Sequence, residues 1–262
     1  MSERRARVLA VTNQKGGVGK TTTALNLAAG LAELKRRVLL IDIDPQGNAT
    51  TGSGIEIGED QPTLCEVLIG EVGISEATVQ ADAMGFDLVP ANGDLTAAEV
   101  ALMDLEDRSG VLKAALDPVR GRYHHVIIDC PPALNVLTLN ALTAADRVLI
   151  PMQCEYYALE GLTALLNTIE QIQDSVNPGL EIEGLVRTMF DIRNNLSGAV
   201  SRQLGEHFGD KLYSTVVPRN VRVAEAPSYG QSVIHYDRES RGAVAYLGLA
   251  GEYLRRLGAD PR

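Results

Sequence analysis

Residues 8–22 read VLAVTNQKGGVGKTT, an apolar run followed by a glycine-rich loop and the start of a helical pattern. Such a loop exposes successive backbone N–H groups, and the helix N-terminus adds positive potential where phosphates bind. This order of strand, loop and helix predicts a phosphate-binding P-loop, in which Lys20 reaches the β- and γ-phosphates and Thr21 ligates Mg²⁺. The predicted nucleotide contacts are Lys15, Gly16, Gly17, Val18, Gly19, Lys20, Thr21 and Thr22.

Two positions of this loop depart from the ordinary P-loop pattern. Gln14 stands where that pattern has glycine, and Lys15 adds a second lysine just before the glycine pair. Lys15 therefore places a second cation beside the phosphates that Lys20 is expected to contact.

Apolar β-rich runs alternate with helical patterns along the chain. This alternation predicts an α/β fold with a mostly parallel, twisted sheet and helices on both faces. With 262 residues, the chain is expected to form one P-loop NTPase domain over 1–262, with flexible ends at 1–6 and 258–262. The expected strands are 8–12, 38–42, 86–89, 126–129, 147–150, 184–190 and 212–217. The expected helices are 21–34, 64–69, 95–105, 110–116, 138–144, 159–176, 197–208, 221–226 and 242–257.

Composition limits where the protein works and what it contacts. Three cysteines without paired spacing indicate a reducing cytoplasm, and no apolar run reaches the ~18 residues of a membrane span. The net charge is −10, and residues 38–107 hold 15 acidic and no basic residues, so the remainder has a basic excess. The acidic segment has two interpretations: a solvated face, or a surface that receives a basic peptide.

Two further apolar runs end in carboxylates. Alternation along a strand places Asp42 and Asp44 on the same side, and the carboxyl ends of parallel strands meet where the P-loop also lies. One of these two carboxylates can hold a metal-bound water while the other orients an attacking water. Asp129, at the end of the run VIID, fits the Walker B role of a carboxylate near Mg²⁺ through water.

Five segments together resemble the ParA/Soj-type partitioning ATPases of the deviant Walker A class. They are NQKGGVGKTT, LLIDIDPQGNATTG, VIIDCPP, TMFDIRNNLS and VPRNVRVAEAPSYGQSV, and the likeness extends from Arg7 to about Leu257. The resemblance implies an enzyme that hydrolyses ATP with Mg²⁺ and partitions chromosomes or plasmids. It also implies an ATP-dependent sandwich homodimer that binds double-stranded DNA nonspecifically, so that the protein associates with the nucleoid. A ParB-type centromere-binding protein is the implied partner, which stimulates hydrolysis and so releases the DNA.

The resemblance also implies roles for single residues. Lys15 matches a lysine that reaches across the dimer to the partner's phosphates, and Gly16 must be small so that two P-loops can approach. Asp44 matches the residue that positions the hydrolytic water. Pro218 and Asn220 match loop positions near the base, and Glu155 is placed near the ribose.

The DNA contacts carry two interpretations. The resemblance implies that Arg193 and Arg222 bind phosphates without sequence preference, and Arg219 and Arg241 are further candidates. The residues alone favour ion pairs instead, with Asp191, Glu225, Asp237 and Glu239.

Three other functions share the nucleotide site. A MinD-like membrane-associated ATPase needs a basic, amphipathic C-terminal anchor, and residues 254–262 offer no tail of that kind, so no membrane partner is expected. A redox or cluster carrier needs closely placed thiolates, and Cys130 lacks a CxxC-spaced partner. A metabolic P-loop enzyme, such as a synthetase or kinase, stays open.

Overall fold

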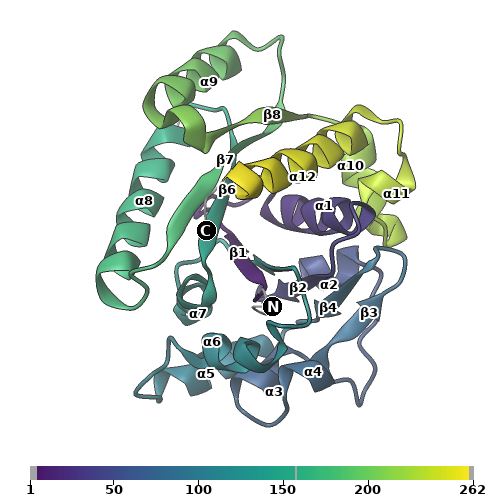
Figure 1. Ribbon diagram of the computed structural model, residues 1–262, viewed down its shortest axis with the longest axis vertical. Coiled ribbons are helices and arrows are strands. Elements are labelled where there is room, and N and C mark those ends of the chain that lie inside the picture. Colours follow the sequence, from purple (N-terminus) through teal and green to yellow (C-terminus); the bar gives the residue numbers. More distant parts are fainter. Residues whose placement is uncertain (1–4, 157, 260–262) are drawn as a thin grey trace.

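The computed structural model describes residues 5–156 and 158–259, and within them one eight-stranded sheet forms the centre of the molecule (Figure 1). The strand order is β3-β4-β2-β5-β1-β6-β7-β8, and every neighbouring pair is parallel except β3 with β4. The strands are β1 (Arg7–Val11), β2 (Val38–Asp42), β3 (Val79–Ala81), β4 (Phe86–Val89), β5 (His125–Asp129), β6 (Arg147–Gln153), β7 (Glu181–Phe190) and β8 (Leu212–Pro218).

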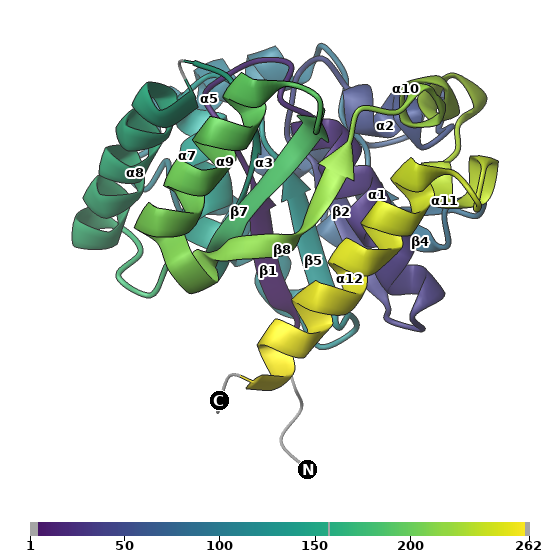
Figure 2. The same cartoon turned by 90° about the horizontal axis from the view of Figure 1, so that it is seen from above.

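Helices cover both faces of the sheet, as Figures 1 and 2 show. Alternate residues of β1 face two different cores: Val8 and Ala10 pack in one, and Leu9 and Val11 in the other. On the first face lie α3 (Leu64–Leu68), α4 (Ile74–Ala77), α5 (Leu95–Met103), α6 (Val111–Leu116), α7 (Val136–Ala144), α8 (Ala158–Ser175) and α9 (Asn195–Phe208). On the second lie α1 (Lys20–Glu33), α2 (Asn48–Gly52), α10 (Val221–Glu225), α11 (Val233–Tyr236) and α12 (Arg241–Ala259). Short 3₁₀ turns cover Asp117–Val119, Gly209–Lys211 and Ala226–Tyr229.

The predicted α/β fold is confirmed, and the seven predicted strands are present with ends shifted by at most three residues. The elements that the sequence did not indicate are short: β3 has three residues, α4 and α11 have four, and α2 has five. Segments of that length show too little hydrophobic periodicity to be recognised.

The described structure reaches into both segments that the sequence predicts to be flexible. Ala6 is buried and its backbone N donates to the Arg120 carbonyl, so the predicted flexible segment 1–6 extends too far into the chain. Helix α12 continues to Ala259. The remaining residues of the two predicted flexible ends, 1–4 and 260–262, lie outside the described residues.

The parallel strands give the sheet two distinct edges. We call the edge at which β1, β2, β5, β6, β7 and β8 end the carboxyl edge, and the edge at which β1, β2, β4 and β5 begin the amino edge. In Figure 2 the strand arrows point to the carboxyl edge, and α12 ends at the amino edge. Within the described ranges, none of the helices combines the length and apolarity needed to cross a bilayer.

Candidate functional site

The glycine-rich loop connects β1 to α1 at the carboxyl edge. Gly17 (φ 73°) and Gly19 (φ 84°) adopt left-handed backbone conformations, which turn the chain abruptly into the helix. No side chain caps the N-terminus of α1 at Gly19, so the first amide groups of the helix remain available to an anion. This is the arrangement that a phosphate-binding loop needs.

Two hydrogen bonds anchor the loop to neighbouring strands, and a third lies within the loop. Thr188 of β7 donates through Oγ1 to the Val18 carbonyl at 2.7 Å. Asn13 donates through Nδ2 to the Pro151 carbonyl at 2.9 Å, and its Oδ1 accepts from the Lys15 backbone N at 3.0 Å. The loop is therefore held in shape before any ligand binds, and the sequence motif did not indicate the contribution of Thr188.

Gln14, the departure from the ordinary P-loop pattern, has a structural role. Its Nε2 donates to Thr168 Oγ1 of α8 at 3.2 Å. A glycine at this position could not make that contact, so Gln14 ties the start of the loop to the helix beside it.

Lys20 is a buried cation with a single backbone acceptor. Its side chain belongs to the first turn of α1, the residue is only 7% exposed, and Nζ donates to the Lys15 carbonyl at 3.3 Å. Burial lowers the pKa of Lys20, although the charge of Asp129 acts in the opposite direction. An anion placed in this loop would therefore satisfy an ammonium group that is already poorly solvated.

The carboxylates of two neighbouring strands lie side by side under the loop. Asp42 at the end of β2 is in register with Asp129 at the end of β5, and both are fully buried. Both oxygens of Asp129 lack a hydrogen-bond partner in the described structure. Burial raises the pKa of Asp129, and the charge of Asp42 adds to this shift. The oxygens of Asp129 have no partner within hydrogen-bond distance, although the nearby Thr21 hydroxyl acts to lower the pKa; such a buried carboxylate beside the P-loop fits a hydrated Mg²⁺ ion.

Asp42 is satisfied by the chain itself. Its Oδ2 accepts from Thr50 N and Thr50 Oγ1, both at 2.8 Å, and its Oδ1 accepts from Asp44 N at 3.2 Å. Burial raises the pKa of Asp42 to about 6, against the effect of the Thr50 hydrogen bonds. These bonds give Asp42 a role in holding the loop that carries Asp44, besides the expected role in holding a metal-bound water.

Asp44 lies at the rim of the same cluster and is 7% exposed. Its Oδ1 accepts from Gln46 N at 3.0 Å. Gly47 then turns the chain with φ 60°, and a Cβ atom at this position would lie 2.6 Å from the Ala91 carbonyl oxygen. The Asp44 side chain is thus presented by a short, tightly packed loop next to the P-loop.

Lys15 and Glu155 form an ion pair at the surface of the site. Lys15 Nζ lies 2.6 Å from Glu155 Oε2, and the two side chains are 41% and 51% exposed. The resemblance places Glu155 near the ribose, and that contact stays a prediction; in this structure the Glu155 carboxylate pairs with Lys15, the second lysine of the loop. The separation of 140 positions between the partners explains why the sequence did not indicate the pair.

Gly16 faces open space. A Cβ atom added to Gly16 would meet no atom within 4 Å. The described residues therefore leave room for a side chain at this position.

The candidate base-binding and DNA-binding residues gather where β7 and β8 end. A hollow of about 870 Å³ there includes Arg193, Pro218, Arg219 and Arg241 in its lining. Asn220 instead caps α10, because its Oδ1 accepts from Val223 N at 3.3 Å. In this structure Asn220 is thus engaged by the chain.

Two of the four candidate arginines are paired with carboxylates. Arg193 lies 2.8 Å from Asp191, and Arg222 lies 2.8 Å from Glu225 and 3.3 Å from Asp237. These are the pairs that the residues alone favoured. Arg222 lies on α10, outside the residues that line the hollow.

Comparisons with known proteins give a consistent result. Residues 6–182 match a protein family described as an AAA domain. The chain is 54% identical to the chromosome partitioning protein ParA of Caulobacter vibrioides over 98% of this chain and 97% of that protein. It is 50% identical to the sporulation initiation inhibitor protein Soj of Bacillus subtilis, over 94% and 97% of the two chains.

A solved structure from Mycobacterium smegmatis is also similar over nearly the whole chain. It is described as cobyrinic acid a,c-diamide synthase with bound ADP and magnesium, and it is 40% identical with a TM-score of 0.84, covering 97% of this chain and 96% of that one.

Proposed function

The chain belongs to the ParA/Soj family of chromosome-partitioning ATPases, and from that premise we propose that ATP closes two copies face to face into a dimer that binds DNA nonspecifically. The protein is an ATPase, and its cofactors are ATP and Mg²⁺. The observation that carries the proposal is Lys15, a surface cation beside a P-loop whose own phosphate lysine, Lys20, is buried.

Within one protomer the loop and its neighbours bind and orient the nucleotide. The free amide groups of α1 and Lys20 would hold the β- and γ-phosphates, and Thr21 and Asp129 would hold Mg²⁺ and its water. Bound Mg²⁺ neutralises charge that develops on the phosphates during transfer. Asp44 orients the attacking water, and Asp42 keeps the Asp44 loop in position.

The second protomer completes the site. Lys15 leaves Glu155 and reaches the partner's phosphates, where it acts as an arginine finger does in other P-loop enzymes. The open space around Gly16 supports this arrangement, because a second P-loop can approach there.

DNA binding follows from the dimer. Each protomer contributes Arg193, Arg219, Arg222 and Arg241 near the ends of β7 and β8, and two copies double this charge. Such contacts are made to phosphates and carry no sequence information. The protein then resides in the cytoplasm at the nucleoid, and a ParB-type partner with a basic segment stimulates hydrolysis by binding the acidic segment 38–107.

The alternative functions, a MinD-like membrane-associated ATPase and a redox carrier, have less support than the partitioning role. The MinD structures that resemble this chain are 22–23% identical and indicate a shared fold only. Cys130 is fully buried, so its thiol is not placed to meet a partner's thiol in a redox carrier. The chromosome partitioning protein ParA of Caulobacter vibrioides has a higher identity to this chain (54%) than the Mycobacterium smegmatis structure (40%).

Light scattering with and without ATP tests the dimer. We expect Lys15→Ala to bind ATP but remain a monomer, because only the contact to the partner is removed. A dimer of Lys15→Ala with wild-type ATP dependence contradicts the role across the interface.

Retention of the protein on DNA tests the proposed binding of DNA by the dimer. We expect ATP-dependent retention of the wild type that ignores DNA sequence and falls steeply with salt. Arg193→Glu and Arg222→Glu should each weaken it while the ATP-dependent dimer persists. If both variants are retained on DNA at low salt as well as the wild type, these arginines form surface ion pairs and do not contact DNA. ATP-dependent binding to anionic vesicles instead of DNA would support the MinD-like alternative.

A further inference from the structure

We propose that a groove between α5, α7 and α8 binds a basic, amphipathic helix of a partner protein. The groove lies on the first face of the sheet, within one protomer, and part of its lining adjoins the nucleotide site. The inference rests on the proposed function in one respect, which is that the helix belongs to the ParB-type partner that stimulates hydrolysis.

The groove is open to solvent and mostly apolar. It has a volume of about 550 Å³, and the three helices that enclose it lie together in the lower left part of Figure 1. Its apolar lining consists of Met103 of α5, Leu134 before α7, Val136 and Leu139 of α7, and Ile172 of α8. A surface of this kind can bury apolar side chains of another molecule.

Helix α5 carries apolar residues on both of its sides. Leu95 and Leu102 pack into the core, whereas Val100 and Met103 are 67% and 55% exposed. Leu134, which also lines the groove, is 52% exposed. Core packing does not account for large apolar side chains that face solvent together, and such patches mark binding sites.

The charges around the groove are almost all negative. Residues 95–110 and 164–175, which cover α5, the loop after it and most of α8, hold six carboxylates and one basic residue, Arg108. The carboxylates are Glu99, Asp104, Glu106, Asp107, Glu170 and Asp174. None of the six forms an ion pair with another residue in the described part of the chain.

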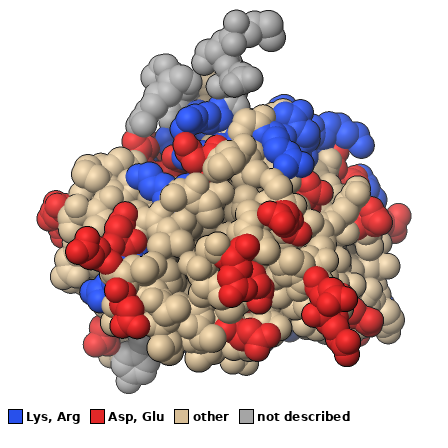
Figure 3. Space-filling model, turned by 90° about the horizontal axis from the view of Figure 1, so that it is seen from below, with Lys and Arg blue, Asp and Glu red and all other residues tan. Residues whose placement is uncertain are grey.

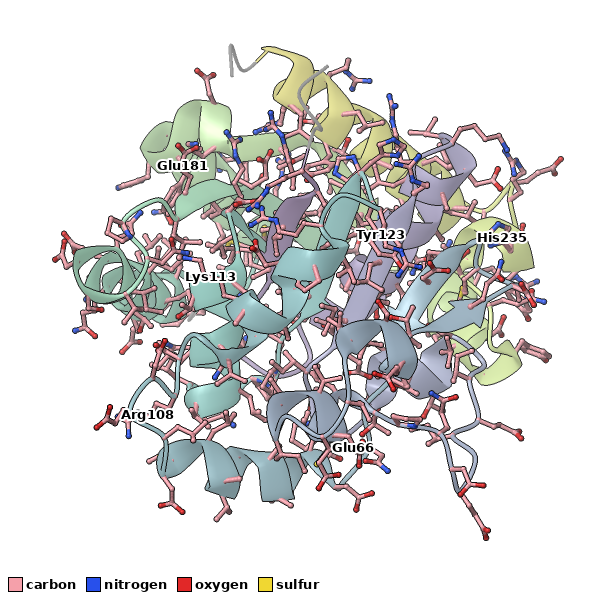
Figure 4. All side chains as sticks on the ribbon, turned by 60° about the horizontal axis from the view of Figure 1, so that its bottom comes forward. Glu66, Arg108, Lys113, Tyr123, Glu181 and His235 are labelled. Atoms are coloured by element: carbon pink, nitrogen blue, oxygen red, sulfur yellow. The ribbon has the colours of Figure 1, made fainter. Side chains whose placement is uncertain are left out.

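The figures agree with this distribution of charge. Figure 3 shows the molecule from below, the side on which α5 lies in Figure 1, and Asp and Glu are spread over this face while most Lys and Arg gather at one rim. In Figure 4 Arg108 projects from the loop after α5 at the outer edge of the molecule. A ligand with positive charges beside its apolar side is therefore complementary to the groove and its rim.

A helix is the form of ligand that this groove can accept. Its walls are helices, whose backbone groups bond within each helix, so they offer no strand edge that a peptide could extend. Recognition must then use side chains. Apolar residues at positions i, i+3, i+4 and i+7 of the ligand fill the groove, and Lys or Arg residues beside them meet the carboxylates.

The groove adjoins the nucleotide site in two places. Thr168 lines the groove, and its Oγ1 accepts a hydrogen bond from Gln14 Nε2 of the P-loop at 3.2 Å. Asn135, another lining residue, lies in the turn that follows the strand ending at Asp129, and its Oδ1 accepts from Thr138 N at 3.1 Å. A helix bound in the groove therefore contacts the supports of both the P-loop and Asp129, through which it can alter hydrolysis.

The binding test uses nucleotide-free protein and a fluorescein-labelled synthetic peptide. The peptide has about 14 residues, with leucines at the spacing given above and lysines at the flanking positions. A peptide of the same composition in scrambled order is the control. We expect the patterned peptide to bind at least about 10-fold more tightly at about 150 mM salt, because only its leucines can enter the groove together. Fluorescence anisotropy measures both affinities.

Met103→Lys tests the apolar wall. We expect it to weaken binding of the patterned peptide at least about 10-fold, because it removes an apolar contact and repels the lysines. Val244→Lys is the matched control and should change binding less than about 2-fold, since Val244 is 60% exposed on α12, which covers the opposite face of the sheet. Both positions face solvent, so neither variant should lose stability.

Glu99→Gln together with Asp174→Asn tests the acidic rim. Glu99 lines the groove from α5, and Asp174 precedes the lining residue Ser175 of α8. We expect this pair to weaken binding about 3- to 10-fold at about 50 mM salt, and the loss should shrink as salt rises. Glu59→Gln with Asp60→Asn, two exposed carboxylates elsewhere in the segment 38–107, is the control for a general loss of negative charge.

The rate of ATP hydrolysis connects the groove to the proposed function. We expect the patterned peptide to raise the wild-type rate at least about 3-fold. Met103→Lys should hydrolyse ATP at the wild-type rate without the peptide and respond little to it. Binding of the peptide without any change in hydrolysis contradicts the proposed link between the groove and the nucleotide site.

Three further results overturn the proposal. The first is equal binding of the patterned and the scrambled peptide. The second is an equal loss of binding in Met103→Lys and Val244→Lys. The third is self-association of the nucleotide-free wild type that Met103→Lys abolishes and the peptide does not compete with, because the occupant is then a second copy of this chain. Dimerisation with ATP and retention on DNA are measured without the peptide, so their failure is distinguishable from failure of the groove.

Discussion

The two edges of the sheet differ in whether their charged side chains are buried or exposed. At the carboxyl edge, Asp42, Asp129 and Lys20 are buried, and Asp129 has no donor within hydrogen-bond distance among the described residues. At the amino edge, Arg36 and Arg122 are exposed to solvent. Buried charges interact strongly and depend on specific partners. Exposed charges are screened by water and salt, so each contributes little and an effect needs several of them together. Substitutions should therefore have large, specific effects at the first edge and small, salt-dependent effects at the second.

The largest effect should follow Lys20→Ala. We expect nucleotide affinity to fall at least about 100-fold, because a charge-assisted contact worth about 3 kcal/mol is lost from a desolvated site. Calorimetric titration with ATP and Mg²⁺ measures this loss. An unchanged affinity for ATP in Lys20→Ala would show that this lysine does not contact the phosphates.

His125 makes stability at the amino edge depend on pH. Burial lowers its pKa to about 4, with the charges of His124, Arg36 and Arg7 adding to the shift. The unfolded chain takes up a proton below pH ~6.5 while the folded chain does not, so this contribution to stability is complete above pH ~6.5 and is lost as the pH falls towards 4.

The variant His125→Phe isolates that contribution. Its deficit in unfolding free energy relative to the wild type should shrink by about 3 kcal/mol between pH 7 and pH 4. Urea unfolding at several pH values measures the difference. A deficit that is constant with pH means that His125 takes up its proton at the same pH in the folded and the unfolded chain.

Thr50→Val probes the support of the carboxylate cluster. The Thr50 hydroxyl donates to Asp42 Oδ2 and accepts from Ala91 N at 2.9 Å, so its removal leaves two buried groups short of a partner. We expect a loss of about 1–3 kcal/mol in unfolding free energy and slower ATP hydrolysis, because the Asp44 loop is less well held. The neighbouring exposed Thr51→Val is the matched control and should be neutral. Equal losses in the two variants would exclude a special role for the Thr50 hydroxyl.

The smallest effect should come from Glu155→Gln. The ion pair of Glu155 with Lys15 is half exposed, so it stabilises the Lys15 side chain in its position in the single protomer by at most about 1 kcal/mol. Removing the charge frees Lys15 for the partner, and ATP-dependent dimerisation should strengthen by up to about 5-fold at low salt. Glu160→Gln, on an exposed residue of α8, is the control. Weaker ATP binding by Glu155→Gln would instead support the ribose contact that the family resemblance implies.

The local features of the carboxyl edge were predictable from the chain. Each of these features depends on residues that are close together in the sequence. They are the P-loop with the strand before it, the strand that ends at Asp129, and the order of the elements. Their patterns can therefore be recognised without knowledge of the fold. The same holds for the Arg193 and Arg222 ion pairs, whose partners are two and three residues away. The pair of Lys15 with Glu155 and the bond from Thr188 to Val18 were not predictable, because they join residues 140 and 170 positions apart.

The sequence by itself determined the fold class, the nucleotide loop, the acidic residues at the strand ends and the uneven distribution of charge. Only the tertiary structure decided that Asp129 is left without a donor among the described residues, that Glu155 holds Lys15, and that α5, α7 and α8 enclose one groove. The reason is the parallel sheet. Its register brings the starts of strands distant in sequence to one edge and their ends to the other, and no local pattern records which strands become neighbours.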